Sequence, residues 1–183
     1  MRGITLQNPQ KIIANRRHPV TIEQNIINRE RFMFSEKWHY RFMEVAKLIA
    51  SWSKDPNTKT GAIVVGPDRE IRATGYNGLV RGVNDDIPER MERPTKYDFF
   101  EHAERNAVYN ACLTGTSLKG CVLYATHPPC TDCARAIIQA GIKMVVTNRL
   151  ADDANAPAGG WRDKLVYSEQ MFKEAGVEYK ILS

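Results

Sequence analysis

Residues 121–147 read CVLYATHPPCTDCARAIIQAGIKMVVT, and their pattern indicates the fold class. The short apolar run at 121–125 predicts a strand, and the run at 143–147 predicts another. Between them, residues 130–140 predict a helix that ends at Gly141. A helix that connects two successive strands in this way is typical of a crossover unit, in which the strands are parallel. The stretch therefore predicts an α/β core.

The same alternation extends on both sides of this stretch. Apolar residues at three- and four-residue spacing predict a helix of about 18 residues from Ser35, which we expect to be its N-cap. The further expected elements are strands at 61–65 and 70–74 that form a hairpin, helices over about 102–113 and 165–175, and a strand at 177–181. Together they predict a three-layer α/β/α domain with an antiparallel hairpin at its start and parallel pairings in its second half.

A polar segment at 75–98 interrupts this pattern. It contains several Gly, Pro and acidic residues and has no sustained apolar period. Because compact domains seldom contain so long a passive connection, we interpret it as a functional loop.

The charge of the chain is concentrated near its start. The net charge is +5 from 26 Lys and Arg against 21 Asp and Glu. We predict a basic extension at residues 1–34 and a catalytic domain at 35–183, because the part after residue 37 is close to neutral. Dispersed charges favour a solvated tail or a subunit contact over nucleic-acid binding. The absence of a long apolar run and of a signal-like start predicts a cytoplasmic protein without membrane spans.

The chain has four cysteines, and a domain of this size needs no disulfide framework. Cys112 and Cys121 lie in apolar surroundings, so we expect both to be small core residues. Cys130 and Cys133 form a C-x-x-C pair after a proline, a pattern expected by chance only about 0.003 times in a chain of this composition. In a cytoplasmic protein such a pair indicates metal or redox chemistry.

The H-x-E sequence at 102–104 supplies the partner of this pair. H-x-E followed by P-C-x-x-C is the signature of the zinc-dependent nucleobase deaminases. Cys130 and Cys133 share one face at a helix start, and His102 completes three ligands, so the fourth position of one catalytic zinc stays open for water. Glu104 then acts as the general base. Because residues two apart on a helix point to opposite sides, His102 must lie at the first helical position, where the backbone is not yet helical.

Two other readings of the cysteine pair stay open from the residues alone. A structural zinc site needs a fourth ligand, for which His127, Cys112 or Cys121 are the candidates, none at a conventional spacing. A redox pair normally follows the first strand of its domain, whereas this pair comes late. A catalytic zinc is the favoured interpretation.

The sequence resembles the deoxycytidylate (dCMP) deaminases over about residues 38–182. The segments that carry the resemblance are SKDPNTKTGA at 53–62, GYNG at 75–78, HAERNA at 102–107, PCTDCA at 129–134 and IIQAGI at 137–142. The resemblance implies a five-stranded mixed sheet of the cytidine-deaminase type. It also implies a homo-oligomer, with a hexamer favoured, and regulation by the effectors dCTP and dTTP.

By that resemblance the reaction is the hydrolysis of dCMP to dUMP and ammonia, with Glu104 carrying the proton. Asn77 matches the residue that holds the deoxyribose hydroxyl, and Lys54 and Asn57 lie on the segment expected to contact substrate, with Lys54 near the 5′-phosphate. His127 departs from the pattern, since relatives place an apolar or hydroxyl residue there. We therefore expect His127 to line the pyrimidine pocket and to affect tolerance at C5.

Regulation shows a second departure from the family pattern. Leu113 stands where regulated relatives often carry Arg. The resemblance implies an effector site, with Mg²⁺ accompanying a bound triphosphate; its candidate residues are Gly75, Tyr76, Gly78, Gly82 and Asn106. Arg105 and Asp132 are interpreted as surface residues.

Three functions compete at this point. The leading one is dCMP deamination. The second is deamination of dCTP, of 5-substituted dCMP or of nucleic-acid bases, although the near-neutral body disfavours a nucleic-acid substrate. The third is a zinc-containing nucleotide sensor without catalysis.

Overall fold

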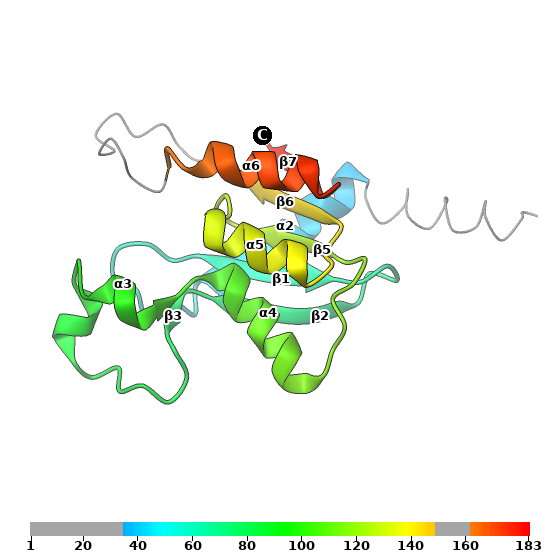
Figure 1. Cartoon of the computed structure of the whole chain (residues 1–183). Coiled ribbons are helices and arrows are strands. Elements are labelled where there is room, and N and C mark those ends of the chain that lie inside the picture. The colour runs from blue at the N-terminus through cyan, green and yellow to red at the C-terminus, as the bar shows by residue number, and fades with distance from the viewer. Residues whose placement is uncertain (1–34, 149–161) are drawn as a thin grey trace, which may run out of the picture.

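A computed structural model of the protein describes residues 35–148 and 162–183 (Figure 1). The predicted basic extension at 1–34 lies outside the described residues. The elements, in chain order, are α2 (Glu36–Ala50), β1 (Gly61–Val65), β2 (Ile71–Tyr76), β3 (Gly78–Leu79), the 3₁₀ helix η1 (Pro88–Met91), α3 (Lys96–Phe99), β4 (Phe100–Glu101), α4 (Ala103–Thr114), β5 (Val122–Ala125), α5 (Thr131–Gln139), β6 (Met144–Asn148), α6 (Leu165–Glu174) and β7 (Glu178–Leu182).

The five longer strands form one mixed sheet in the order β2-β1-β5-β6-β7. β1 pairs antiparallel with both β2 and β5, whereas β5, β6 and β7 pair in parallel. The hairpin, the parallel second half and the cytidine-deaminase-like α/β fold class are thereby confirmed. Ser35 precedes the first helix as predicted, but its side chain makes no capping hydrogen bond.

Helices cover both faces of this sheet (Figure 1). Alternate strand residues point to opposite faces. Ala62, Leu123 and Val145 belong to the apolar core shared with α4, α5 and α6. Their neighbours along the strands, such as Ile63 and Tyr124, belong to a second core that α2 closes from the other side. The predicted three layers are therefore present.

Two glycines on adjacent strands let helices approach the sheet closely. A Cβ added at Gly61 would lie 2.2 Å from the carbonyl oxygen of Ala46 in α2. A Cβ added at Gly75 would lie 2.3 Å from the carbonyl oxygen of Ala103 and 2.4 Å from the backbone nitrogen of Ala107, both in α4. Gly75, which the sequence suggested as an effector contact, thus also sets the position of α4.

The segment at 75–98 contains short elements that the sequence did not predict. β3 pairs with β4 in a small antiparallel sheet, with η1 and α3 between them. Such short elements are stabilised by tertiary contacts, and tertiary contacts produce no periodic pattern of apolar residues in the sequence.

The prediction for Cys112 was wrong, because its side chain is exposed, whereas Cys121 is buried as expected. Among the described residues, no helix is both long enough and apolar enough to cross a membrane.

The close approach at Gly75 gives a stability prediction. We expect Gly75→Ala to lower the free energy of unfolding by about 1–3 kcal/mol, because the added methyl group overlaps backbone atoms of α4 that cannot move alone. Urea denaturation measures the change. Gly78→Ala is the matched control, since its Cβ would meet nothing nearer than a Tyr76 ring carbon at 3.8 Å. Equal stability of Gly75→Ala and wild type would contradict this account of the packing.

Candidate active site

The N-termini of α4 and α5 meet at one place and bring the two sequence motifs together. His102 is the N-cap of α4, with φ −79° and ψ 151°, so its backbone is extended and not helical. This confirms the predicted position of His102. Cys130 is the N-cap of α5, with φ −68° and ψ 172°, and Cys133 follows in the first turn of that helix.

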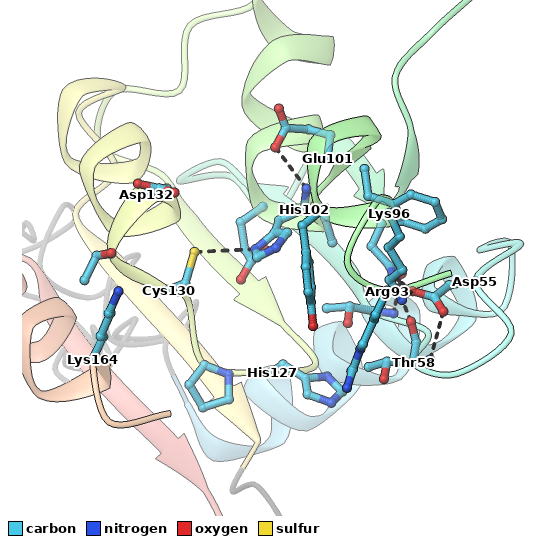
Figure 2. Close-up of a pocket in the computed structure, with 18 residues that line it drawn as sticks. Asp55, Thr58, Arg93, Lys96, Glu101, His102, His127, Cys130, Asp132 and Lys164 are labelled. Carbon is cyan, nitrogen blue, oxygen red and sulfur yellow. Dashed lines mark hydrogen bonds and ion pairs between the residues drawn. The ribbon is translucent and has the colours of Figure 1, made fainter. Parts of the chain in front are cut away.

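The three side chains form a compact cluster, part of which Figure 2 shows. His102 Nδ1 lies 3.4 Å from Cys130 Sγ and 3.5 Å from Cys133 Sγ, and the two sulfur atoms lie 3.6 Å apart. Zinc bonds of about 2.3 Å to sulfur and 2.0–2.1 Å to nitrogen, at tetrahedral angles, require about 3.7 Å between two sulfurs and about 3.6 Å between sulfur and nitrogen. The cluster therefore fits one zinc ion.

The number of ligands also indicates a catalytic rather than a structural zinc site. Within residues 35–148 and 162–183, the group of His, Cys, Asp and Glu side chains close enough to share an ion consists of these three residues. His127, Cys112 and Cys121, which could have closed a structural site, do not join it. Three protein ligands with a free fourth position are typical of catalytic zinc.

The local electrostatics favour a thiolate in this cluster. The hydrogen bond between Cys130 Sγ and Cys133 Sγ lowers the pKa of Cys130 to about 4, and the hydrogen bond with His102 lowers it further. The same hydrogen bond, together with burial, raises the pKa of Cys133. The contact with Cys130 raises the pKa of His102. The protonation states of His102, Cys130 and Cys133 are therefore coupled. A metal ion bound by the three side chains would displace their protons.

Glu104 lies beside the cluster without belonging to it. Its carboxyl is 3% exposed, and its Oε2 lies 3.6 Å from Cys133 Sγ. Burial raises the pKa of this carboxyl above its ordinary value. A buried carboxyl next to an open metal position is suited to receive and return a proton.

Arg105 links the two helix starts, a role that the sequence did not reveal. Its guanidinium pairs with Glu101, and the Glu101 carboxylate in turn accepts a hydrogen bond from the backbone nitrogen of His102 at 3.0 Å. Arg105 Nη1 also lies 3.5 Å from Asp132 Oδ2, in the first turn of α5. The interpretation of Arg105 as a surface residue was wrong, because its side chain is 19% exposed and bridges α4 and α5.

A cavity of about 410 Å³ opens over the cluster. This volume is within the usual range for small-molecule sites. Of the predicted substrate residues, Asn77 and His127 line the cavity together with Glu104, His102 and Cys130. The structure adds lining residues that the sequence missed, and these are Asp55, Thr58, Thr60, Arg93, Lys96, Tyr97, Phe100 and Lys164. Three of them, Arg93, Lys96 and Tyr97, come from the segment at 75–98, which its length had marked as functional.

Asn77 is held by a network on one wall of the cavity. Its Nδ2 donates to Thr58 O at 2.8 Å and to Asp55 Oδ2 at 3.1 Å, while its Oδ1 accepts from the backbone nitrogen of Thr60 at 2.7 Å. Lys96 Nζ lies 2.5 Å from Asp55 Oδ2, and both side chains are buried. Burial alone would raise the pKa of Asp55, but the hydrogen bonds from Lys96 and from two backbone nitrogens outweigh burial and lower it.

Two predicted substrate residues lie outside the lining of this cavity. The Lys54 side chain is exposed and pairs with Asp85. Asn57 is exposed and lines a neighbouring hollow together with Pro56 and Arg93.

Three of the predicted effector residues, Gly75, Tyr76 and Asn106, lie against one another where α4 meets the end of β2. The Asn106 side chain donates to the carbonyl oxygen of Tyr76 at 2.7 Å and so braces the end of β2. Gly82 is exposed with φ +81°, and Leu113 is exposed on α4.

Comparison with known proteins identifies the family of this chain. Residues 36–149 match the family model of the cytidine and deoxycytidylate deaminase zinc-binding region, and the cluster lies inside the match. The chain belongs to the cytidine and deoxycytidylate deaminase family. The match covers both motifs, so the residues and the geometry agree on the family.

The relatives support this membership. The chain is 41% identical over 142 residues to an uncharacterized deaminase of Aliivibrio fischeri, with 78% of this chain and 91% of that protein covered. It is 38% identical over 151 residues to the deoxycytidylate deaminase of Homo sapiens, with 79% of each chain covered. The crystal structure of the dCMP deaminase of cyanophage S-TIM5 in complex with dCMP and dUMP is similar, with a TM-score of 0.64, 27% identity and 81% and 98% of the two chains covered.

The buried ion pair beside the cavity gives a second stability prediction. We expect Lys96→Met to lower the free energy of unfolding at pH 7 by about 3–5 kcal/mol, because it leaves the Asp55 carboxylate buried without its cation. In wild type the lowered pKa of Asp55 stabilises the fold above pH 3.8, and this contribution is lost as the pH falls through the lowered value. Without Lys96, burial raises the pKa of Asp55 in the variant, so this carboxyl takes up a proton at a higher pH than in wild type and the deficit should shrink as the pH falls.

Urea titrations from pH 7 to pH 4 measure this difference. Asp85→Asn, which removes the exposed pair with Lys54, is the control and should leave stability unchanged. A deficit of Lys96→Met that is constant with pH would contradict the role of the ion pair.

Proposed function

We propose that this protein catalyses the hydrolytic deamination of dCMP to dUMP and ammonia. The observation that carries the proposal is the His102, Cys130 and Cys133 cluster, which fits one zinc ion with an open position and has the buried carboxyl of Glu104 beside it. Relatives that align with most of this chain are deoxycytidylate deaminases, and this supports dCMP as the substrate.

The residues of this chain divide the chemistry among them. A zinc ion held by the three ligands supplies Lewis acidity that activates water near neutral pH. Glu104 would take one proton from the attacking water and pass it to N3 of the pyrimidine ring, and it would then take a second proton, from the hydroxyl group formed at C4, and pass it to the departing amino group. The Glu104 carboxyl lies at the cluster, with Oε2 3.6 Å from Cys133 Sγ, and Arg105 holds the two helix starts together.

The cavity supports a free nucleotide as the substrate. We propose that Asn77, which lines the cavity, accepts the hydrogen bond of the sugar hydroxyl at Oδ1, the atom that also accepts from the backbone nitrogen of Thr60. Tyr97 and Phe100 supply aromatic surface for the ring or the sugar. The alternatives, which are dCTP, 5-substituted dCMP and nucleic-acid bases, need additional contacts for their extra groups.

The assembly and regulation of the enzyme are further predictions. We expect a homo-oligomer, with a hexamer favoured, and a cytoplasmic location. The family resemblance implies a dCTP or dTTP site at the loop from Gly75 to Gly82, with Mg²⁺ accompanying the triphosphate. Leu113 departs from the pattern of regulated relatives, which often carry Arg at this position. We also propose the division into an extension at 1–34 and a catalytic domain at 35–183.

Replacement of Glu104 tests the proposed function. We expect Glu104→Gln to retain one zinc ion per chain and to lower kcat for dCMP by at least about 100-fold, because the amide cannot carry the proton. Ammonia release and metal analysis on the same samples measure both quantities. Glu174→Gln, an exposed substitution on α6, is the control. A zinc-loaded Glu104→Gln protein with normal turnover would refute the role of Glu104.

His127 gives a prediction for substrate selectivity. Its half-buried side chain lines the cavity, and burial lowers its pKa, so it is neutral at pH 7. We propose that it faces the C5 edge of the pyrimidine. His127→Leu should then change the ratio of kcat/KM for 5-methyl-dCMP to that for dCMP by about tenfold, the usual effect of one methyl group in a pocket. An unchanged ratio would show that His127 does not contact C5.

A further inference from the structure

A nucleotide brings a phosphate group into the cavity, and a charged phosphate needs a cationic partner there. The described residues that line the cavity include three Lys or Arg side chains, which are Arg93, Lys96 and Lys164. The choice among them takes dCMP as the substrate and so rests on the proposed function.

Lys96 already has a partner for its charge. Its ammonium group lies 2.5 Å from the Asp55 carboxylate, and the two side chains are 8% and 1% exposed. It also lies over the Phe100 ring, at 5.2 Å from the centroid. A phosphate that recruited Lys96 would leave a buried carboxylate without its cation, which is costly.

Lys164 lies on the other wall of the cavity. It is the N-cap of α6, and α6 packs against α5. In Figure 2, Lys164 lies on the side of Cys130 and Asp132, which come from the start of α5. This is the wall that carries the metal ligands and not the wall that carries Asn77.

Arg93 lies on the wall that carries Asn77. Figure 2 shows its side chain on the side of Asp55 and Thr58, and these are the residues to which the Asn77 amide donates. Arg93 also borders the neighbouring hollow with Asn57. With the pyrimidine at Glu104 and the sugar at Asn77, as proposed above, the 5′-substituent can reach the exposed Arg93 side chain on this wall.

The chemistry of Arg93 suits this position. Its side chain is exposed and lies over the Tyr97 ring, with its guanidinium carbon 5.8 Å from the centroid. Within residues 35–148 and 162–183, no carboxylate forms an ion pair with it. A guanidinium without a carboxylate partner presents its planar set of donors to a phosphate in bidentate fashion.

We propose that Arg93 binds the 5′-phosphate of the substrate and thereby selects a nucleotide over a nucleoside. This assigns to Arg93 the contact that sequence reasoning gave to Lys54, whose side chain pairs with Asp85 outside the cavity lining.

The test compares ligands with and without the phosphate on the zinc-loaded, full-length protein. Arg93→Gln should raise KM for dCMP and Kd for dUMP by about 10- to 100-fold, the loss expected for charge-assisted hydrogen bonds. The Kd for deoxyuridine and the kcat/KM for deoxycytidine should not change, because neither ligand carries a phosphate. The kcat for dCMP should change little, since the phosphate contact is present in both ground and transition states. Calorimetry measures binding, and ammonia release measures turnover.

Three further variants sharpen the result. Arg93→Lys should give intermediate values, because a point charge replaces the bidentate fork. Lys164→Gln should not weaken the binding of dUMP more than the binding of deoxyuridine. Arg41→Gln is the matched control, since Arg41 is exposed on α2 and lies over the Trp38 ring, outside the cavity lining. Equal losses for dUMP and deoxyuridine in Arg93→Gln, no loss for either, or a selective loss in Lys164→Gln would overturn the assignment.

The experiment separates this inference from the proposed function. If zinc-loaded wild type releases no ammonia from dCMP, the proposed function fails, while the comparison of dUMP with deoxyuridine still reports on Arg93. If wild type is active and Arg93→Gln binds dUMP normally, the assignment of Arg93 alone fails.

Discussion

The structure depends on the meeting of two helix N-termini at one point. Three soft ligands from segments 28 residues apart have to come within about 3.6 Å of one another, since a zinc ion accepts little deviation in bond length. Extended backbone at His102 and Cys130 makes this feasible, because it turns both side chains out of their helices. The positive ends of the two helix dipoles also favour thiolates at this point.

The packing of α4 against the sheet serves this same requirement. Gly75 lets the backbone of α4 approach β2 at the turn that follows His102, and Asn106 fastens the same turn to the end of β2. Arg105 then joins α4 to α5 through Glu101 and Asp132. The position of the histidine relative to the cysteines is therefore set by backbone contact and by ion pairs, and not by the metal alone.

The sequence predicted the regular elements and the metal ligands, because both depend on local spacing. Apolar periods fix the long helices and strands, and H-x-E and C-x-x-C place ligands on helix starts. Prediction from the sequence failed where the surroundings of a residue depend on segments that are distant along the chain. Arg105 looks like a surface residue until α5 lies beside it, and Cys112 has apolar neighbours along the chain but lies on the outer face of α4. Arg93, Lys96 and Tyr97 reach the cavity through short elements that have no period.

The Asn77 wall shows how a buried charge can orient a neutral side chain. An ionised carboxylate only accepts hydrogen bonds, so Asp55 has to face the Asn77 nitrogen, and this fixes which end of the amide is the oxygen. Lys96 keeps Asp55 ionised, and the backbone nitrogen of Thr60 uses one of the two lone pairs of Oδ1. The second lone pair of Asn77 Oδ1 remains available as a hydrogen-bond acceptor. Through Asp55, Lys96 thus holds the Asn77 amide in one orientation, and this is the orientation that the proposed contact with the sugar hydroxyl requires.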